Sequence, residues 1–315
     1  MQINGVFEVD KLRELISRAS KLYNRNLDHL PATLELIEHS MNLLGENAKY
    51  DYFGPFKGKK EISYHAFFGN NEISRPIRDD LYIRDINIYK ELSNNVLIDL
   101  KQINTSWNSD KSILANKVIY TSIMSIACAF DLWKKGSRKT PGTVFEIYIA
   151  ALLKVMLPNE IFSKHIPLID QINSDEELAD PASVSTDVVI KSGADVNRGV
   201  VIPLKITTRE RIVQPFAQQR ILDSYFGNGV FKSFLACISE TQQDKVNQKV
   251  NHICVPGTIR LYQKYLSNVA GMYYCDIPER YLQADLTDII PVKSMGEFLL
   301  DINNFFMRTA QFAPH

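Results

Sequence analysis

The sequence predicts a mixed α/β fold (α+β in arrangement), in which a mixed β-sheet is flanked by helices. Two runs rich in β-branched residues, 187–191 and 200–206, flank a connection rich in Gly, Asn and Asp, a pattern typical of a β-hairpin. Beyond this hairpin, 231–239 and 271–278 read as buried strands, and 257–268 between them as a helix. A hairpin followed by strand–helix–strand predicts a mixed sheet between layers of helices.

The N-terminal region, residues 1–110, is expected to be mostly helical. Apolar residues recur at helical spacing in two stripes within 7–48, and 81–110 alternates charged residues with Ile, Leu and Tyr. The polar connector at 104–110 indicates a boundary between subdomains. We therefore expect a helical region up to residue 110 and a catalytic core over 111–315.

Residues 49–80 differ from the helical stretches around them. Aromatic side chains alternate with Gly, Asn and lysines at 57, 59 and 60. One interpretation is a loop-rich segment that reaches the backbone or a groove of DNA. The other is a structured loop packed by its own aromatic side chains, and the sequence leaves both open.

A helix over 111–133 is apolar nearly all round and should be buried. After it, four positive charges occur in the six residues 134–139, and they lead into an apolar helix with Glu146 in its expected first turn. A solvated loop before a core helix explains this pattern. A Glu in a first turn is also favoured by the helix dipole alone.

Composition narrows the function classes. The 315 residues carry 36 basic and 36 acidic side chains, so no global charge attracts a polyanion, which argues against a nonspecific nucleic-acid coat protein. Four cysteines without C-x-x-C spacing predict free thiols rather than zinc ligands or disulfides. The start lacks a signal-peptide pattern, and the apolar run 118–130 is too short to cross a bilayer. We expect a cytoplasmic protein without a membrane partner.

The predicted hairpin brings an acid and a lysine together. In an antiparallel pair, the numbers of opposed residues sum to a constant, and a turn centred near Val196 places Asp187 opposite Lys205. Directly opposed residues share a face, with Cβ atoms roughly 5 Å apart. Taken alone, such a pair is also an ordinary surface ion pair.

The residues after the lysine predict a helix. Thr207 and Glu210 have the spacing of a capping box, so a helix should begin directly after the lysine. Arg211 and Gln218 lie two turns apart on it and share a face if the helix is continuous. Pro215 threatens that continuity, because proline removes a backbone donor.

This arrangement resembles type II restriction endonucleases of the PD-(D/E)xK class. The residues that carry the resemblance are Asp187 and the run Lys-Ile-Thr-Thr-Arg-Glu-Arg at 205–211, within a stretch of roughly 137–225. They match the branch in which the second acidic ligand has moved to the helix after the lysine. Two positions depart from the family: Pro203 replaces an acid, and an amide, Gln218 or Gln219, occupies the relocated position. The Pro of the "PD" pair is Thr186 here. These departures leave the number of metal ions open.

The resemblance implies a restriction-endonuclease-like core that hydrolyses double-stranded DNA at a specific sequence with Mg²⁺. It implies three metal-binding groups: Asp187, Glu146 and the backbone carbonyl of Leu204. Gln218 would act through water, and Lys205 would position or deprotonate the attacking water. The basic side chains expected at phosphates and DNA are Arg209, Arg211, Arg138 and Lys139.

Cutting both strands of a palindromic site favours a two-fold symmetric homodimer, with a tetramer as the alternative. A rival interpretation is a catalytically inactive DNA-binding protein on a nuclease-like fold, motivated by the missing acid at 203 and the amide at 218. A third is an α/β scaffold without a nucleic-acid role, which predicts no salt-dependent DNA binding. Metal dependence separates the enzyme from the binder.

Overall fold

The computed structural model describes residues 5–56, 59–134, 139–168, 182–193, 198–244 and 246–310. A seven-stranded sheet lies at its centre, in the order β13-β12-β9-β7-β6-β5, with β8 also paired to β9. Its strands are β5 (Ile161–Pro167), β6 (Ser183–Lys191), β7 (Gly199–Ile202), β8 (Leu204–Lys205), β9 (Phe231–Cys237), β12 (Gly271–Tyr274) and β13 (Val292–Ser294). β6 is antiparallel to both of its neighbours, β5 and β7, whereas β7, β9, β12 and β13 run parallel. The predicted mixed sheet is confirmed.

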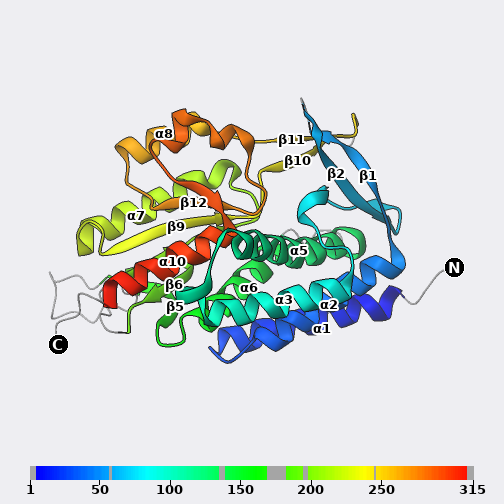
Figure 1. The fold of residues 1–315 in the computed structure, drawn as a ribbon, viewed down its shortest axis with the longest axis horizontal. Coiled ribbons are helices and arrows are strands. Elements are labelled where there is room, and N and C mark those ends of the chain that lie inside the picture. Colours follow the sequence, from blue (N-terminus) through cyan, green and yellow to red (C-terminus); the bar gives the residue numbers. More distant parts are fainter. Residues whose placement is uncertain are drawn as a thin grey trace.

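Helices cover both faces of this sheet (Figure 1). One face carries α5 (Ser109–Trp133), α6 (Thr140–Met156) and α10 (Met295–Ala310), and the other carries α7 (Val213–Phe226) and α8 (Pro256–Tyr265). Side chains of β9 alternate between the two cores: Phe234 and Ala236 join the first, whereas Leu235 and Cys237 join the second. This burial on both faces explains the continuous apolar runs in the sequence.

Helix α5 is long and apolar enough to cross a membrane, but 83% of its apolar window is buried inside the fold. It contacts α2, α3, α6 and α10, as expected for a core helix. The four cysteines are free, and Cys128, Cys237 and Cys275 are buried.

The N-terminal helices are confirmed. They are α1 (Gly5–Asn24), α2 (Leu30–Asn47), α3 (Ile86–Lys101) and the short α4 (Ile103–Ser106). Leu36 and Ile37 of α2 belong to the same core cluster as Phe145 of α6. The subdomain boundary near residue 110 stays a prediction, and this core cluster contains residues from both sides of it.

Residues 49–80 form strands, so the expected loop-rich segment was wrong. The strands are β1 (Lys49–Phe56), β2 (Lys59–Gly69), β3 (Glu72–Ile73) and β4 (Ile77–Arg78). They join β10 (Thr241–Asp244) and β11 (Lys249–His252) in a six-stranded second sheet at one end of the molecule (Figure 1). Phe53, Tyr64, Ala66 and Val250 bury together there, at the period-two spacing of strands. Lys57 lies outside the described residues.

The central hairpin has a different register from the predicted one. Lys191 pairs with Gly199 and Val188 with Ile202, so the turn is centred one position earlier than expected. Continuing this register places Asp187 opposite Pro203 rather than Lys205. Because proline has no N–H group, it separates β7 from β8, while its carbonyl still accepts a bond from Ala236 N at 3.0 Å.

Candidate active site

Asp187 and Lys205 are in contact despite the shifted register. Asp187 Oδ2 accepts from Lys205 Nζ at 2.7 Å and from the backbone N of Leu204 at 2.7 Å. Lys205 shares a face with Pro203, the residue opposite Asp187, so it is a diagonal neighbour whose long side chain reaches the carboxylate. The Lys205 side chain is only 12% exposed, so solvent weakly screens this ion pair.

The pairing of β5 with β6 is irregular at Asp187. Thr186–Val188 of β6 lie opposite the single residue Lys164 of β5, because the pairing register shifts there. Such bulges bend a strand and re-aim its side chains, and they are frequent beside active sites. The carbonyl oxygen of Asp187 lies 3.3 Å from the hydroxyl oxygen of Tyr23, a residue of α1.

The same tyrosine links Asp187 to Glu146. Tyr23 donates to Glu146 Oε1 at 3.0 Å, and Lys164 Nζ lies 2.7 Å from that oxygen. Burial of the phenol, together with the nearby Glu146 carboxylate, raises the pKa of Tyr23 well above its usual value, so the hydroxyl stays protonated and donates. The structure therefore brings Glu146 to the predicted Asp187–Lys205 pair.

Glu146 lies in the second turn of its helix, not in the first as predicted. Helix α6 begins at Thr140, and Pro141 occupies its first turn, where a missing N–H costs nothing. The interaction between an acid and the helix dipole falls off beyond the first turn. Contacts with Tyr23 and Lys164, rather than the dipole, hold this carboxylate.

The capping box was also wrong. Arg209–Ile212 form a 3₁₀ turn and α7 starts at Val213, so no continuous α-helix begins at the lysine. Thr208 occupies the N-cap position without a capping bond from its side chain. Its hydroxyl donates to Glu240 Oε1 at 2.5 Å, and its backbone N donates to both oxygens of that carboxylate. The buried Glu240 therefore anchors the segment that follows Lys205.

Pro215 does not kink the helix. It is the third residue of α7, within the first turn, where backbone N–H groups have no partner inside the helix. Because the 3₁₀ turn precedes α7, the two-turn spacing between Arg211 and Gln218 is not that of one α-helix. Arg211 is exposed, and the side chains of Arg209 and Glu210 lie outside the described residues.

The two candidate amides have different environments. Gln218 Nε2 donates to the carbonyl of Ser185 at 2.5 Å, two positions before Asp187 on β6, and Gln218 Oε1 is buried without a hydrogen-bond partner among the described residues. Gln219 uses both ends of its amide on β9: Nε2 donates to Phe231 O and Oε1 accepts from Ser233 N. The Gln219 amide thus has a structural role, whereas the Oε1 atom of Gln218 is available to bind a water or a cation.

Of the predicted basic loop, Arg138 lies outside the described residues, and Lys139 is exposed directly before α6. Sequence reasoning missed Tyr23 and Lys164. Tyr23 is 164 positions from Asp187, and only the folded chain places α1 beside β6. Lys164 lies on β5, opposite a bulge of β6 that no local pattern in the sequence indicates.

The oxygen groups suit a hard divalent cation. Mg²⁺ is usually bound through one or two carboxylates plus substrate phosphates and water. Asp187 and Glu146 supply two carboxylates, and the described residues contain no cluster of three or more Asp, Glu, His or Cys side chains. The unpartnered Oε1 of Gln218 is a further oxygen. The donor set fits a magnesium site that the substrate completes.

The carbonyl of Leu204 faces the same side as its N–H. Pro203 O and Lys205 O accept from Ala236 N and Ile238 N, so both face β9. Polar backbone groups alternate in direction along a strand, and the N–H of Leu204 meets Asp187. Its carbonyl therefore lies on the side of β8 that faces away from β9, the side on which its N–H meets Asp187.

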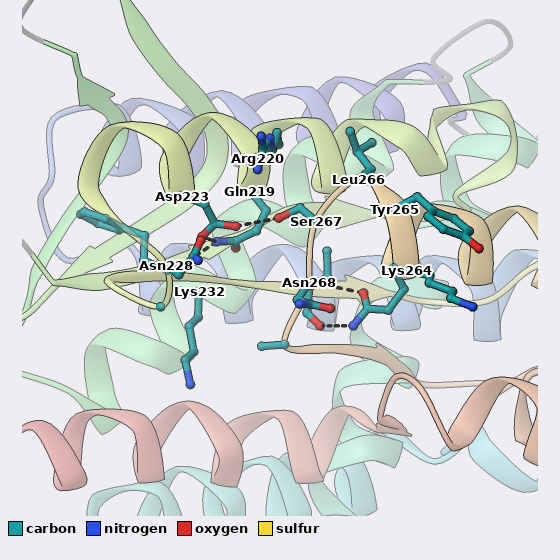
Figure 2. Close-up of a pocket in the computed structure, with 15 residues that line it drawn as sticks. Gln219, Arg220, Asp223, Asn228, Lys232, Lys264, Tyr265, Leu266, Ser267 and Asn268 are labelled. Carbon is teal, nitrogen blue, oxygen red and sulfur yellow. Dashed lines mark hydrogen bonds between the residues drawn. The ribbon is translucent and has the colours of Figure 1, made fainter.

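A cavity of about 550 Å³ lies elsewhere, between α7 and α8 at the amino ends of β9 and β12 (Figure 2). Its polar groups bind one another: Asp223 accepts from Gln219 and Ser267. Lys232 and Lys264 point in different directions rather than converging on one point (Figure 2). Lys205 pairs with Cys237 at the carboxyl end of β9. The cavity and the active site therefore lie at opposite ends of this strand.

Comparison with known proteins was made by sequence and by structure. No family model and no curated protein matches the chain. A crystal structure of the type IIP restriction endonuclease Kpn2I is 67% identical, with a TM-score of 0.87, and the match covers 95% of this chain and 99% of that one. A complex of the restriction endonuclease PspGI with substrate DNA aligns at 13% identity and a TM-score of 0.39, over 70% of this chain and 92% of that one. On the near full-length match to Kpn2I, this chain belongs to the type II restriction endonucleases.

Proposed function

We propose that this protein is a site-specific deoxyribonuclease that hydrolyses phosphodiester bonds of double-stranded DNA with Mg²⁺. The observation that carries the chemistry is the Asp187–Lys205 pair with Glu146 beside it, where β8 and β9 end. Family membership supplies the reaction class and the general use of a divalent metal. The choice of Mg²⁺ rests on the all-oxygen donors of the site.

Asp187, Glu146 and the carbonyl of Leu204 would hold the cation, and Gln218 would orient a water through its unpartnered Oε1. A divalent cation at this position polarises the scissile phosphate and lowers the pKa of a water. Two carboxylates favour one metal ion over two.

Lys205, held as an ammonium by Asp187, would position the attacking water and stabilise the charge that develops on the phosphate. Its ammonium group is held by Asp187 in a largely buried position, so little reorganisation is needed during the reaction. Arg209 and Arg211 follow on the same segment and would pair with phosphate oxygens as bidentate donors.

DNA contacts are also proposed outside the central site. Arg138 and Lys139 precede the helix that carries Glu146, so a phosphate bound there would lie next to the catalytic helix. The second sheet offers exposed amides on β10 and its turn, at Gln242 and Asn247, and such side chains read base edges in a groove.

We further propose a homodimer, because two-fold symmetry lets one active site act on each strand of a palindromic sequence. A tetramer is the alternative, because it also contains pairs of subunits related by a two-fold axis. The buried free thiols suit a reducing compartment, so we place the protein in the cytoplasm.

The test is digestion of a long, fully sequenced, unmethylated DNA with Mg²⁺, beside an EDTA control. Discrete bands are expected, and mapping their ends yields the recognition sequence. A smear would keep the nuclease and remove the sequence specificity. Intact DNA with positive gel shifts in Ca²⁺ would favour the second candidate, an inactive DNA-binding protein, which the missing carboxylates at Pro203 and Gln218 motivate.

A further inference from the structure

The candidate active site contains a second lysine that lies outside the PD-(D/E)xK motif. Lys205 contacts Asp187 at 2.7 Å, and Lys164 contacts Glu146 at the same distance. Each of the two carboxylates thus has one ammonium partner. These four side chains carry no net charge before any cation or DNA arrives.

The structure holds Lys164 in this position by several contacts. It faces the bulge of β6 that contains Asp187, so its side chain projects where the regular pairing is interrupted. Its Nζ lies 4.3 Å from the centre of the Tyr23 ring and 3.4 Å from Asn24 Oδ1, both on α1. A cation over an aromatic face is stabilised by the ring electrons. The side chain is 39% exposed, so an incoming phosphate can reach it.

Glu146 has competing partners. Tyr23 and Lys164 both use Oε1, so a cation that binds this carboxylate competes with the ammonium for the same negative charge. A divalent cation also raises a neutral cluster to a charge of plus two. The phosphates of DNA are the negative groups that offset this charge.

We propose that Lys164 is a phosphate-binding residue of the active site, held on Glu146 in the DNA-free protein and transferred to a DNA phosphate when a divalent cation takes that carboxylate. The inference rests on the proposed function. In the DNA-free protein, Lys164 opposes the cation at Glu146. With DNA bound, it adds one contact to the backbone. Lys164 therefore couples the two binding events, and each ligand strengthens the binding of the other by the same factor.

The first measurement is Mn²⁺ binding to DNA-free protein, by electron paramagnetic resonance of the free ion. Lys164→Met removes the competing ammonium and is expected to tighten Mn²⁺ binding by about fivefold, the order of one partly exposed ion pair. Lys164→Arg keeps the charge and should stay near wild type. Lys154→Met is the matched control: it removes a cation from the same helix as Glu146, where Lys154 bonds Asn26 instead.

The second measurement is binding of specific DNA in Ca²⁺ at several salt concentrations. Loss of one phosphate contact in Lys164→Met should weaken binding and reduce the slope of log affinity against log salt by about one. Unchanged Mn²⁺ affinity with an unchanged slope would overturn the proposal and leave Lys164 as a structural ion pair. If wild type neither binds nor cuts DNA, the proposed function fails instead. Thermal melts check folding, and Lys164→Gln, which still donates to Glu146, replaces the Met variant if that one unfolds.

Discussion

The chemistry proposed for Lys205 depends on its ion pair with Asp187. Its partner, Asp187, also accepts from the backbone of Leu204, so the carboxylate orients both the lysine and the strand. We expect Lys205→Ala to slow cleavage by at least about a hundred- to a thousandfold, while specific binding in Ca²⁺ is largely retained. Rates on a mapped substrate and gel shifts measure the two effects.

The control for that experiment is Lys191→Ala, which removes a lysine from the last residue of β6 and leaves the Asp187–Lys205 pair in place. Joint loss of cleavage and binding in Lys205→Ala, with a lowered melting temperature, would indicate misfolding rather than lost catalysis.

Gln218→Glu restores a carboxylate at the relocated acidic position. In the metal-free protein the new charge faces the carbonyl of Ser185 without a donor, so we expect a loss of about 1–3 kcal/mol in the free energy of unfolding. Mg²⁺ should recover this loss, because a third carboxylate strengthens the site. The amide of Gln219 bonds the backbone of β9, so Gln219→Glu should also lower the free energy of unfolding, and Mg²⁺ should not restore it. Equal metal responses in the two variants would contradict a metal-site role for Gln218.

At the residue scale, sequence reasoning identified the groups that local pattern places together. Strand alternation predicted the contact of Asp187 with Lys205. The prediction held although the register was wrong, because diagonal neighbours in a sheet also share a face. Tyr23 and Lys164 were not predictable, because a helix far away in sequence and a bulge bring them to the site. The capping box predicted for Thr207 and Glu210 was wrong because the N-cap residue is Thr208, and its hydroxyl binds Glu240, which lies 32 positions further on.

Two helices show how glycine permits close packing at the scale of elements. A Cβ added to Gly296 of α10 would lie 2.0 Å from the carbonyl oxygen of Ser112 on α5, whereas a Cβ on Gly45 of α2 would meet nothing within 4 Å. We expect Gly296→Ala to destabilise the protein by at least about 1–3 kcal/mol, because α10 must move away from α5. Gly45→Ala should stabilise it by about 0.5–1 kcal/mol. Chemical denaturation measures both, and similar values for the two would refute the close contact.

The spacing of apolar residues predicted the helices of the chain correctly. Residues 7–48, 81–110 and 111–133 formed the expected helices. Residues 49–80 were misassigned because Gly54 and Pro55, which look like loop residues, lie inside β1. The Cβ position of Gly54 would lie 2.0 Å from the backbone oxygen of Gln248, so this glycine serves a close approach of two chain segments. No local pattern reveals such an approach.

At the scale of the whole molecule, buried charges join the second sheet to the central one. Asp276, fully buried just after β12, accepts from Arg78 of β4 at 2.9 Å and from Tyr64 of β2 at 2.8 Å. Burial and the two neighbouring carboxylates, Asp80 and Asp276, act in opposite directions on the pKa of Arg78. The net effect raises this pKa, so the arginine stays charged.

Arg78→Met leaves the Asp276 carboxylate buried without its cation, and we expect a loss of about 3–5 kcal/mol in the free energy of unfolding. The control is Arg18→Met, which breaks an exposed ion pair with Glu35 and should cost less than about 1 kcal/mol. Denaturation midpoints provide the comparison. A small effect at Arg78 would mean that its ion pair with Asp276 contributes little to joining the two sheets. The sequence did not predict this junction, because it joins residues of 49–78 to Asp276, about 200 positions further on.

The pairing of β1 with β11, at Phe56 and Val250, also has a consequence for protein synthesis. The N-terminal hairpin leaves the ribosome long before its partner strand is made. At 5–20 residues per second, the edge of β1 waits roughly 10–40 s for β11. During this interval the nascent chain presents an unpaired strand edge to other chains. Aggregation during expression should therefore depend on translation speed and temperature, and chaperones that bind early chains should protect this edge.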